Sequence, residues 1–74
     1  MRVKNVKFFI TLNADKTIRY FAKNADLSPQ QATRLLKLWL NEGLVMKNNE
    51  TPTRYKHTAK GYVLMHKLAA VMTT

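Results

Sequence analysis

Residues 17–45, TIRYFAKNADLSPQQATRLLKLWLNEGLV, constrain the fold of this chain more than any other segment. Apolar residues recur there at helical spacing in two blocks, which the short link Ala25-Asp26-Leu27 separates. The segment predicts a short helix over residues 17–24, a tight turn, and a longer helix from Pro29 to Asn41. Ile18, Phe21, Ala22 and Ala25 form the expected inner side of the short helix.

The longer helix has consistent start and end signals. Ser28 is a good N-cap, Pro29 stands at the first helical position, and Gln31 at the third can complete a capping box. Gly43 tolerates the left-handed conformation in which many helices end. These signals predict where the helix begins and where it stops.

Two faces appear when this helix is placed on a wheel at about 100° per residue. The apolar face is made of Ala32, Leu35, Leu36, Trp39 and Leu40. The opposite face is made of Gln30, Thr33, Arg34, Lys37 and Asn41 and contains no acid. We therefore expect the apolar face, with Trp39, to lie in the core.

The polar face has the chemistry of a helix that enters the DNA major groove. Arginine can bond guanine through two hydrogen bonds, glutamine can bond adenine, and lysine can neutralise a phosphate. The base-reading candidates are Gln30, Thr33 and Arg34, which come early in the helix, and Lys37 is expected on the backbone. The alternative is an ordinary solvated face, which the short turn, the following hairpin and the missing acids disfavour.

The charge balance also indicates a polyanion partner. Among 74 residues, 13 lysines and arginines face four acids, which gives a formal net charge of +9. Such a charge indicates nucleic acid most often, and an anionic membrane sometimes. The first 20 residues lack a signal-peptide core, and no segment is as long as a membrane span. We expect one domain over residues 1–74, cytoplasmic and associated with the nucleoid, without a membrane partner.

No residue constellation supports an enzyme. The chain has no cysteine, and His57 and His66 lack the further ligands that a metal site needs. Ser28 is better explained as a cap than as a nucleophile, and the four acids are scattered. We therefore expect no catalytic residue, no metal, no cofactor and no small-molecule ligand.

The flanking segments complete a mainly α fold with a small β-hairpin (α+β). Val3, Val6, Phe9 and Ile10 predict an amphipathic helix from Val3 to about Leu12, although Phe8 and Leu12 blur the stripe and leave a strand as the alternative. Either Asp15 or Thr17 is expected to cap the next helix. Leu44-Val45-Met46 and Arg54-Tyr55-Lys56-His57 predict a hairpin over residues 44–57, and Thr58 is expected to cap a last helix over residues 59–72.

The last helix carries an apolar arc of roughly 180°, wider than one core face needs. The surplus predicts either closure against the first helix or a homodimer through Tyr62, Met65, Leu68 and Met72. The tyrosines Tyr20, Tyr55 and Tyr62 are expected to pack, although each could stack on bases and Tyr55 could face DNA.

The chain resembles winged helix-turn-helix DNA-binding domains of the small prokaryotic or phage regulator type. Ala22, Leu27, Ala32 and Leu35 occupy the small and apolar positions of that pattern over residues 17–42. The phrase LKLWLNEGLV is similar to the family's exit into the first wing strand, and RYKHTAKGYVLMHKL resembles the second strand and helix start of MarR-like proteins. Asp26 stands where the family often has glycine, so the turn must accept a side chain.

The resemblance implies further contacts with double-stranded DNA. Lys47, Arg54 and Lys56 would touch phosphates or the minor groove from the wing, and Arg19 and Lys23 would lie over the backbone. We expect a sequence-specific transcriptional regulator with its recognition helix over residues 29–41. The alternatives are a non-specific replication or architectural protein, and a winged-helix module that binds an acidic protein.

Overall fold

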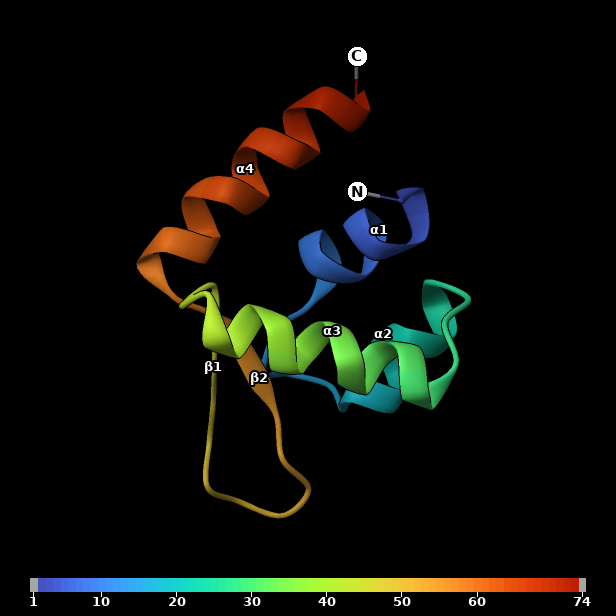
Figure 1. Ribbon diagram of the computed structural model, residues 1–74, viewed down its shortest axis with the longest axis vertical. Coiled ribbons are helices and arrows are strands. Elements are labelled where there is room, and N and C mark those ends of the chain that lie inside the picture. Colours follow the sequence, from blue (N-terminus) through green and yellow to red (C-terminus); the bar gives the residue numbers. More distant parts are fainter. Residues whose placement is uncertain (1, 74) are drawn as a thin grey trace.

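Helices and one antiparallel hairpin follow one another along residues 2–73, which the computed structural model describes (Figure 1). The elements are α1 (Val3–Thr11), α2 (Ile18–Asn24), α3 (Pro29–Asn41), β1 (Val45–Lys47), β2 (Tyr55–His57) and α4 (Ala59–Thr73). The fold class and the element order are as predicted. The helix expected in the last segment begins at the predicted residue, and β1 lies one residue later than its prediction.

An aromatic cluster between α1 and α3 forms the centre of the core. The ring centroid of Trp39 lies 5.5 Å from that of Phe8 and 4.9 Å from that of Phe9. All three side chains are almost completely buried, together with Leu12. Because aromatic rings bury a large apolar area, this cluster holds α1 against the back of α3.

The buried face of α1 agrees with the predicted one in part. The segment is a helix, and Val6 and Phe9 are buried as expected. However, Val3 is 72% exposed, whereas Phe8 and Leu12, which blurred the predicted stripe, are buried. Phe8, Phe9 and Leu12 join the core cluster, so the face that packs is turned toward the residues that the predicted stripe left out.

Neither predicted cap residue bonds the start of α2. Thr17 occupies the N-cap position, but its side chain makes no capping hydrogen bond. No capping bond from the Asp15 side chain is observed either. Its backbone N–H donates to the side-chain oxygen of Asn13 at 2.7 Å. The inner side of α2 is as predicted, with Phe21, Ala22 and Ala25 buried and Ile18 half-buried.

The hairpin has one face toward the body of the protein and one toward solvent. Its register pairs Val45 with His57, Met46 with Lys56, and Lys47 with Tyr55. Side chains alternate along a strand, so Tyr55 and His57 share one face, and Met46 and Lys56 share the other. Tyr55 packs against the core, whereas Met46 is exposed. We call residues 44–57 the wing.

His57 fastens the base of the wing to α1. Its Nε2 lies 2.6 Å from the Phe9 carbonyl oxygen, and its ring meets the Phe9 ring edge-on at 4.8 Å. Burial lowers the pKa of His57 below the ordinary value of 6.5, and the hydrogen bond to Phe9 opposes this shift only in part. The neutral imidazole is therefore the form that suits the folded protein.

The start of α4 is bonded to the end of α3. The Thr58 hydroxyl accepts from the Gly61 N–H at 3.1 Å, which confirms the predicted cap, and donates to the Gly43 carbonyl. The Lys60 ammonium donates to the Glu42 carbonyl at 3.0 Å. At Gly61 the helix backbone lies so close to the Leu44 carbonyl that a Cβ would overlap it.

Much of the apolar surface of α4 stays outside the core. Leu64, Met65 and Leu68 pack partly against the core, whereas Tyr62, Val63, Val71 and Met72 are exposed. The prediction that the tyrosines pack is correct for Tyr55 and wrong for Tyr20 and Tyr62, which are 48% and 53% exposed. Both exposed rings have local partners instead, Lys16 above Tyr20 and His66 beside Tyr62.

Within residues 2–73, none of the helices has both the length and the hydropathy needed to cross a lipid bilayer.

We expect the substitution Gly61→Ala to cost at least about 3 kcal/mol in the free energy of unfolding, because backbone atoms must separate to admit the methyl group. Gly43→Ala is the control. Gly43 has a φ of 74° but open space around it, so the methyl group costs only about 1–2 kcal/mol of left-handed strain. Urea denaturation measures both variants. Equal losses would contradict the close approach of α4 to Leu44.

We expect the free energy of unfolding to decrease as the pH falls from about 7 to about 5. The folded pKa of His57 is lowered, so the unfolded chain binds the proton more readily, and protonation below the ordinary value of 6.5 favours unfolding. Urea denaturation at several pH values should show this dependence in His66→Gln but not in His57→Gln. A dependence that survives in His57→Gln would contradict the assignment.

Candidate nucleic-acid interface

A complete capping box begins α3. The Gln31 backbone N–H donates to the Ser28 hydroxyl at 3.2 Å, and the Ser28 backbone N–H donates to the Gln31 side-chain oxygen at 2.9 Å. Pro29 stands at the start of the helix, as predicted. The box commits the Gln31 amide to the backbone, whereas the neighbouring Gln30, which is also exposed, takes no part in it.

The turn between α2 and α3 accepts a side chain in a left-handed conformation. Asp26 has a φ of 58°, a region that aspartate and asparagine tolerate better than most residues with a side chain. The Leu27 N–H donates to the Ala22 carbonyl at 2.8 Å and closes the turn. The Asp26 carboxylate pairs with Lys4 of α1 at 3.0 Å, but both groups are well exposed, so this ion pair adds little stability.

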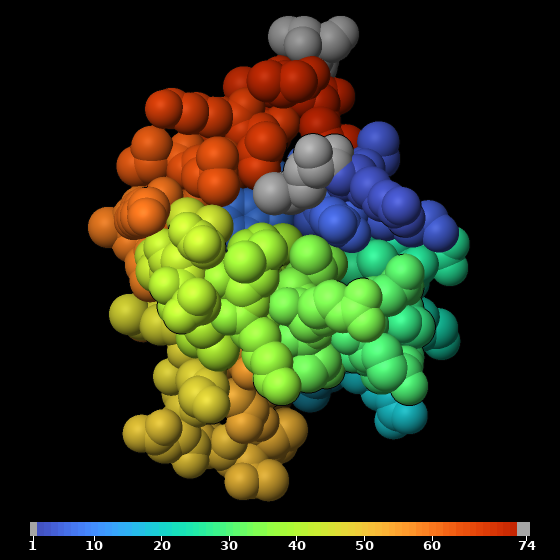
Figure 2. Space-filling model, viewed as in Figure 1, coloured from blue at the N-terminus to red at the C-terminus, as the bar shows by residue number. Residues whose placement is uncertain are grey.

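The two faces of α3 are as the sequence predicted. Ala32, Leu36 and Trp39 are buried, and Leu35 and Leu40 are half-buried against the core. Gln30, Thr33, Arg34, Lys37 and Asn41 are all exposed. Figure 2 shows α3 across the middle of one side of the molecule, with the wing below it and α1 and α4 above it.

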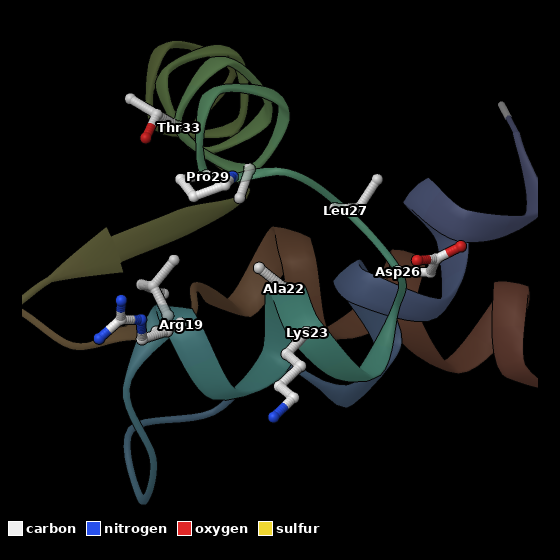
Figure 3. A pocket seen from close by; sticks show the side chains of 9 residues that line it. Arg19, Ala22, Lys23, Asp26, Leu27, Pro29 and Thr33 are labelled. Carbon is white, nitrogen blue, oxygen red and sulfur yellow. The ribbon is translucent and has the colours of Figure 1, made fainter.

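A groove of about 510 Å³ lies between α2 and α3 (Figure 3). Its floor is apolar and includes Ala22 and Leu27, and cationic residues of α2 line its edge. In Figure 3, Arg19 lies at the same end of the groove as Thr33, whereas Lys23 extends away from α3 toward solvent. Arg19 and Thr33 therefore line the same end of the groove from opposite sides, and Lys23 lines it with its ammonium group directed away from α3.

A second hollow, of about 340 Å³, lies between α3 and the wing. Lys37 and Thr33 line it from the helix, and Lys47, Thr53 and Tyr55 line it from the hairpin. Thr33 and Ile18 also line the groove between α2 and α3, so the two depressions lie next to each other. Lysines on both walls, with hydroxyl groups between them, make this hollow suitable for a phosphate backbone.

Arg34 lies on the other flank of α3. It lines a hollow of about 250 Å³ with Arg2 and Asn5 of α1 and the half-buried Leu35. The sequence grouped Arg34 with Thr33 as base-reading candidates, but the two side chains line different depressions. Arg2 was not a candidate from the sequence, because its position beside α3 depends on how α1 packs.

The outer side of the wing carries the remaining predicted cations. Lys56 and Arg54 line a hollow of about 350 Å³ with Lys47 and Met46 of the wing and with Ala14 of the loop between α1 and α2. The Arg54 guanidinium Nη1 donates to the carbonyl oxygens of Ala14 and Asp15, each at 3.2 Å. Arg54 therefore has a structural contact that sequence reasoning missed, since its acceptors lie about forty residues away.

Asp26 is the one acidic residue in the linings of these two adjacent depressions. Asp26 lines the far end of the groove between α2 and α3, and no acid lines the hollow between α3 and the wing. Within residues 2–73, no cluster of three or more metal-binding side chains occurs. The polar groups that line the surface from α2 across α3 to the wing are therefore predominantly cations and hydroxyl groups, set around an apolar floor.

We expect Ser28→Ala to reduce the free energy of unfolding by about 1 kcal/mol, because it removes an N-cap that is observed to bond. Thr17→Ala is the matched control and should change it by less than about 0.5 kcal/mol, since Thr17 makes no capping bond. Thermal or urea unfolding of the two variants provides the comparison. A Thr17→Ala loss as large as that of Ser28→Ala would contradict the assignment of the caps.

Comparison with known proteins finds similarity at the level of structure. The sequence matches no family model, and no curated protein matches it either. A MarR family transcriptional regulator from Silicibacter pomeroyi superposes on 99% of this chain with a TM-score of 0.81 and 24% identity. A mutant of ZitR from Lactococcus lactis superposes on 95% with a TM-score of 0.78 and 17% identity.

The chain spans only about half the length of these two proteins, 55% of the first and 51% of the second. The superposition nevertheless extends over nearly every element described above. The order of helices, the tight turn before α3 and the hairpin after it agree with this similarity. Residues 2–73 therefore have the winged helix-turn-helix fold of MarR-like proteins.

Proposed function

We propose that this chain binds double-stranded DNA sequence-specifically and acts as a small transcriptional regulator. The observation that carries the proposal is the pair of depressions beside α3, one toward α2 and one toward the wing, whose linings include Arg19, Lys23, Lys37 and Lys47. The fold of the MarR family regulator and the net charge of +9 support it. In this proposal the protein is a binding protein and not an enzyme, and it would be found with the nucleoid.

The proposed roles follow the positions of the side chains. Gln30 and Thr33, near the start of α3, would read base edges in the major groove. Lys37 and Lys47 would hold one phosphate backbone between α3 and the wing, and Arg19 would contact the backbone beside α2. The more peripheral cations Lys23, Arg34 and Lys56 would contribute at the flanks.

A second copy of the chain would give the protein two recognition helices. The predicted dimer surface needs revision, because Met65 and Leu68 pack partly against the chain's own core. Tyr62 and Met72 are exposed, and so is Val63, which the prediction left out. A homodimer through this part of α4 would read two half-sites about one helical turn apart.

The test is a selection of duplexes from random double-stranded DNA at about 150 mM salt. Affinities of the enriched and scrambled duplexes are then measured at about 50 and about 200 mM salt. We expect a recurrent motif that binds far more tightly than scrambled DNA, and the symmetry of the motif reports the dimer. Salt-sensitive binding without a motif would indicate a non-specific DNA-binding protein. No binding would leave a protein-interaction module.

Three variants separate base reading from phosphate contact. Gln30→Ala should relax specificity by about 1–3 kcal/mol at the base it contacts. Lys37→Gln should weaken all duplexes alike and reduce the log–log salt slope by about 0.9. Lys67→Gln removes the same charge from α4, at a residue that lines none of the four depressions described above, and should change neither quantity. A uniform loss from Gln30→Ala would contradict base reading.

A further inference from the structure

Arg54 is held at both its side chain and its backbone. Its guanidinium Nη1 donates to the carbonyls of Ala14 and Asp15, in the loop between α1 and α2. Its backbone N–H donates to the Asn48 side chain at 3.1 Å, and its backbone carbonyl accepts from the Asn48 N–H at 3.1 Å. Arg54 thus connects the two chain segments of the wing with each other through Asn48, and connects both to the loop between α1 and α2.

The hydrogen bonds of Arg54 lie nearer the tip of the wing than the hydrogen bond of His57 to Phe9. His57 fastens the base of the hairpin to Phe9, and Arg54 fastens it beyond the last strand pair, Lys47 with Tyr55. The described hydrogen bonds beyond Arg54 are local to the loop, such as that from Thr53 to Glu50. A hairpin of two short strands is marginally stable by itself, so its position depends on such attachments.

Arg54 and Lys47 differ in the hollows that they line. Lys47 lines the hollow between α3 and the wing (the inner hollow), which it shares with Lys37, and it also lines the hollow on the outer side of the wing (the outer hollow). Arg54 lines only the outer hollow, beside Met46 and Lys56, and its Nη1 already bonds two backbone carbonyls. A phosphate in the inner hollow is therefore contacted by Lys47 and not by Arg54.

We propose that Arg54 is a positioning residue that holds the wing against the loop between α1 and α2 and thereby keeps Lys47 opposite Lys37. The DNA part of this inference rests on the proposed function. Charge-assisted bonds to phosphate form within a narrow range of about 2.7–2.9 Å between heavy atoms. A wing that moves freely satisfies this range less often, so loss of Arg54 weakens binding without removing a phosphate contact.

The test uses four variants of the full chain. Arg54→Gln removes the charge and the long guanidinium, and Arg54→Lys keeps the charge but lacks Nη1, the atom that bonds both carbonyls. Lys56→Gln removes a charge that lines only the outer hollow, and Lys47→Gln removes the wing cation that also lines the inner hollow. Circular dichroism first checks that each variant keeps its helices.

The first readout is hydrogen exchange of the wing amides without DNA. Both Arg54 variants should speed exchange of the Asn48 and Arg54 amides relative to wild type. The expected factor is roughly tenfold, which corresponds to the loss of one charge-assisted hydrogen bond. Lys56→Gln should leave these amides unchanged. Exchange that is unchanged in both Arg54 variants overturns the proposal, whether or not the protein binds DNA.

The second readout is the salt dependence of binding to the selected duplex. Both Arg54 variants should lower affinity by a similar factor at each salt concentration and keep the wild-type slope. Lys47→Gln should reduce the slope by about 0.9, the change for one lost phosphate contact. Wild-type affinity in Arg54→Lys, with a reduced slope in Arg54→Gln, would make Arg54 a phosphate contact and overturn the proposal. Absence of wild-type binding would contradict the proposed function, and the exchange result would then decide the inference.

Discussion

The packing of Trp39 between Phe8 and Phe9 is the interaction on which the other parts of this structure depend. Trp39 is the largest side chain of α3, and its burial fixes the rotation of that helix about its own axis. This rotation decides that the acid-free face of α3 points to solvent. Phe9 also meets the ring of His57 and offers its carbonyl to it, so the same cluster sets the base of the wing.

Local signals made the sequence most informative at α3. Ser28, Gln31 and Gly43 act through bonds and conformations within a few residues, and each is observed where its local chemistry predicts it. The face of α1 was predicted only in part, because Val6 and Phe9 are buried as expected but the adjacent Phe8 is buried as well, and helical spacing alone does not decide between neighbouring apolar residues. The strands are only three residues long, so their limits depend on pairing across the hairpin more than on the residues themselves.

The candidate site shows the same division between local and distant effects. Exposure of the polar face of α3 follows from its apolar face and was predictable from helical spacing. The grouping of its side chains was not, because the depressions that hold Thr33, Lys37 and Arg34 are completed by α1, α2 and the wing. The bonds from Arg54 to Ala14 and Asp15 cross about forty residues, and no local pattern encodes them.

The bonded junction of Thr58 and Lys60 with the end of α3 has a mechanical consequence. The first turn of α4 is bonded to the carbonyls of Glu42 and Gly43, and Gly61 lies against the Leu44 carbonyl. The start of α4 can therefore tilt relative to the end of α3 only if these bonds stretch or break. The angle between the two helices is in part set by these few residues.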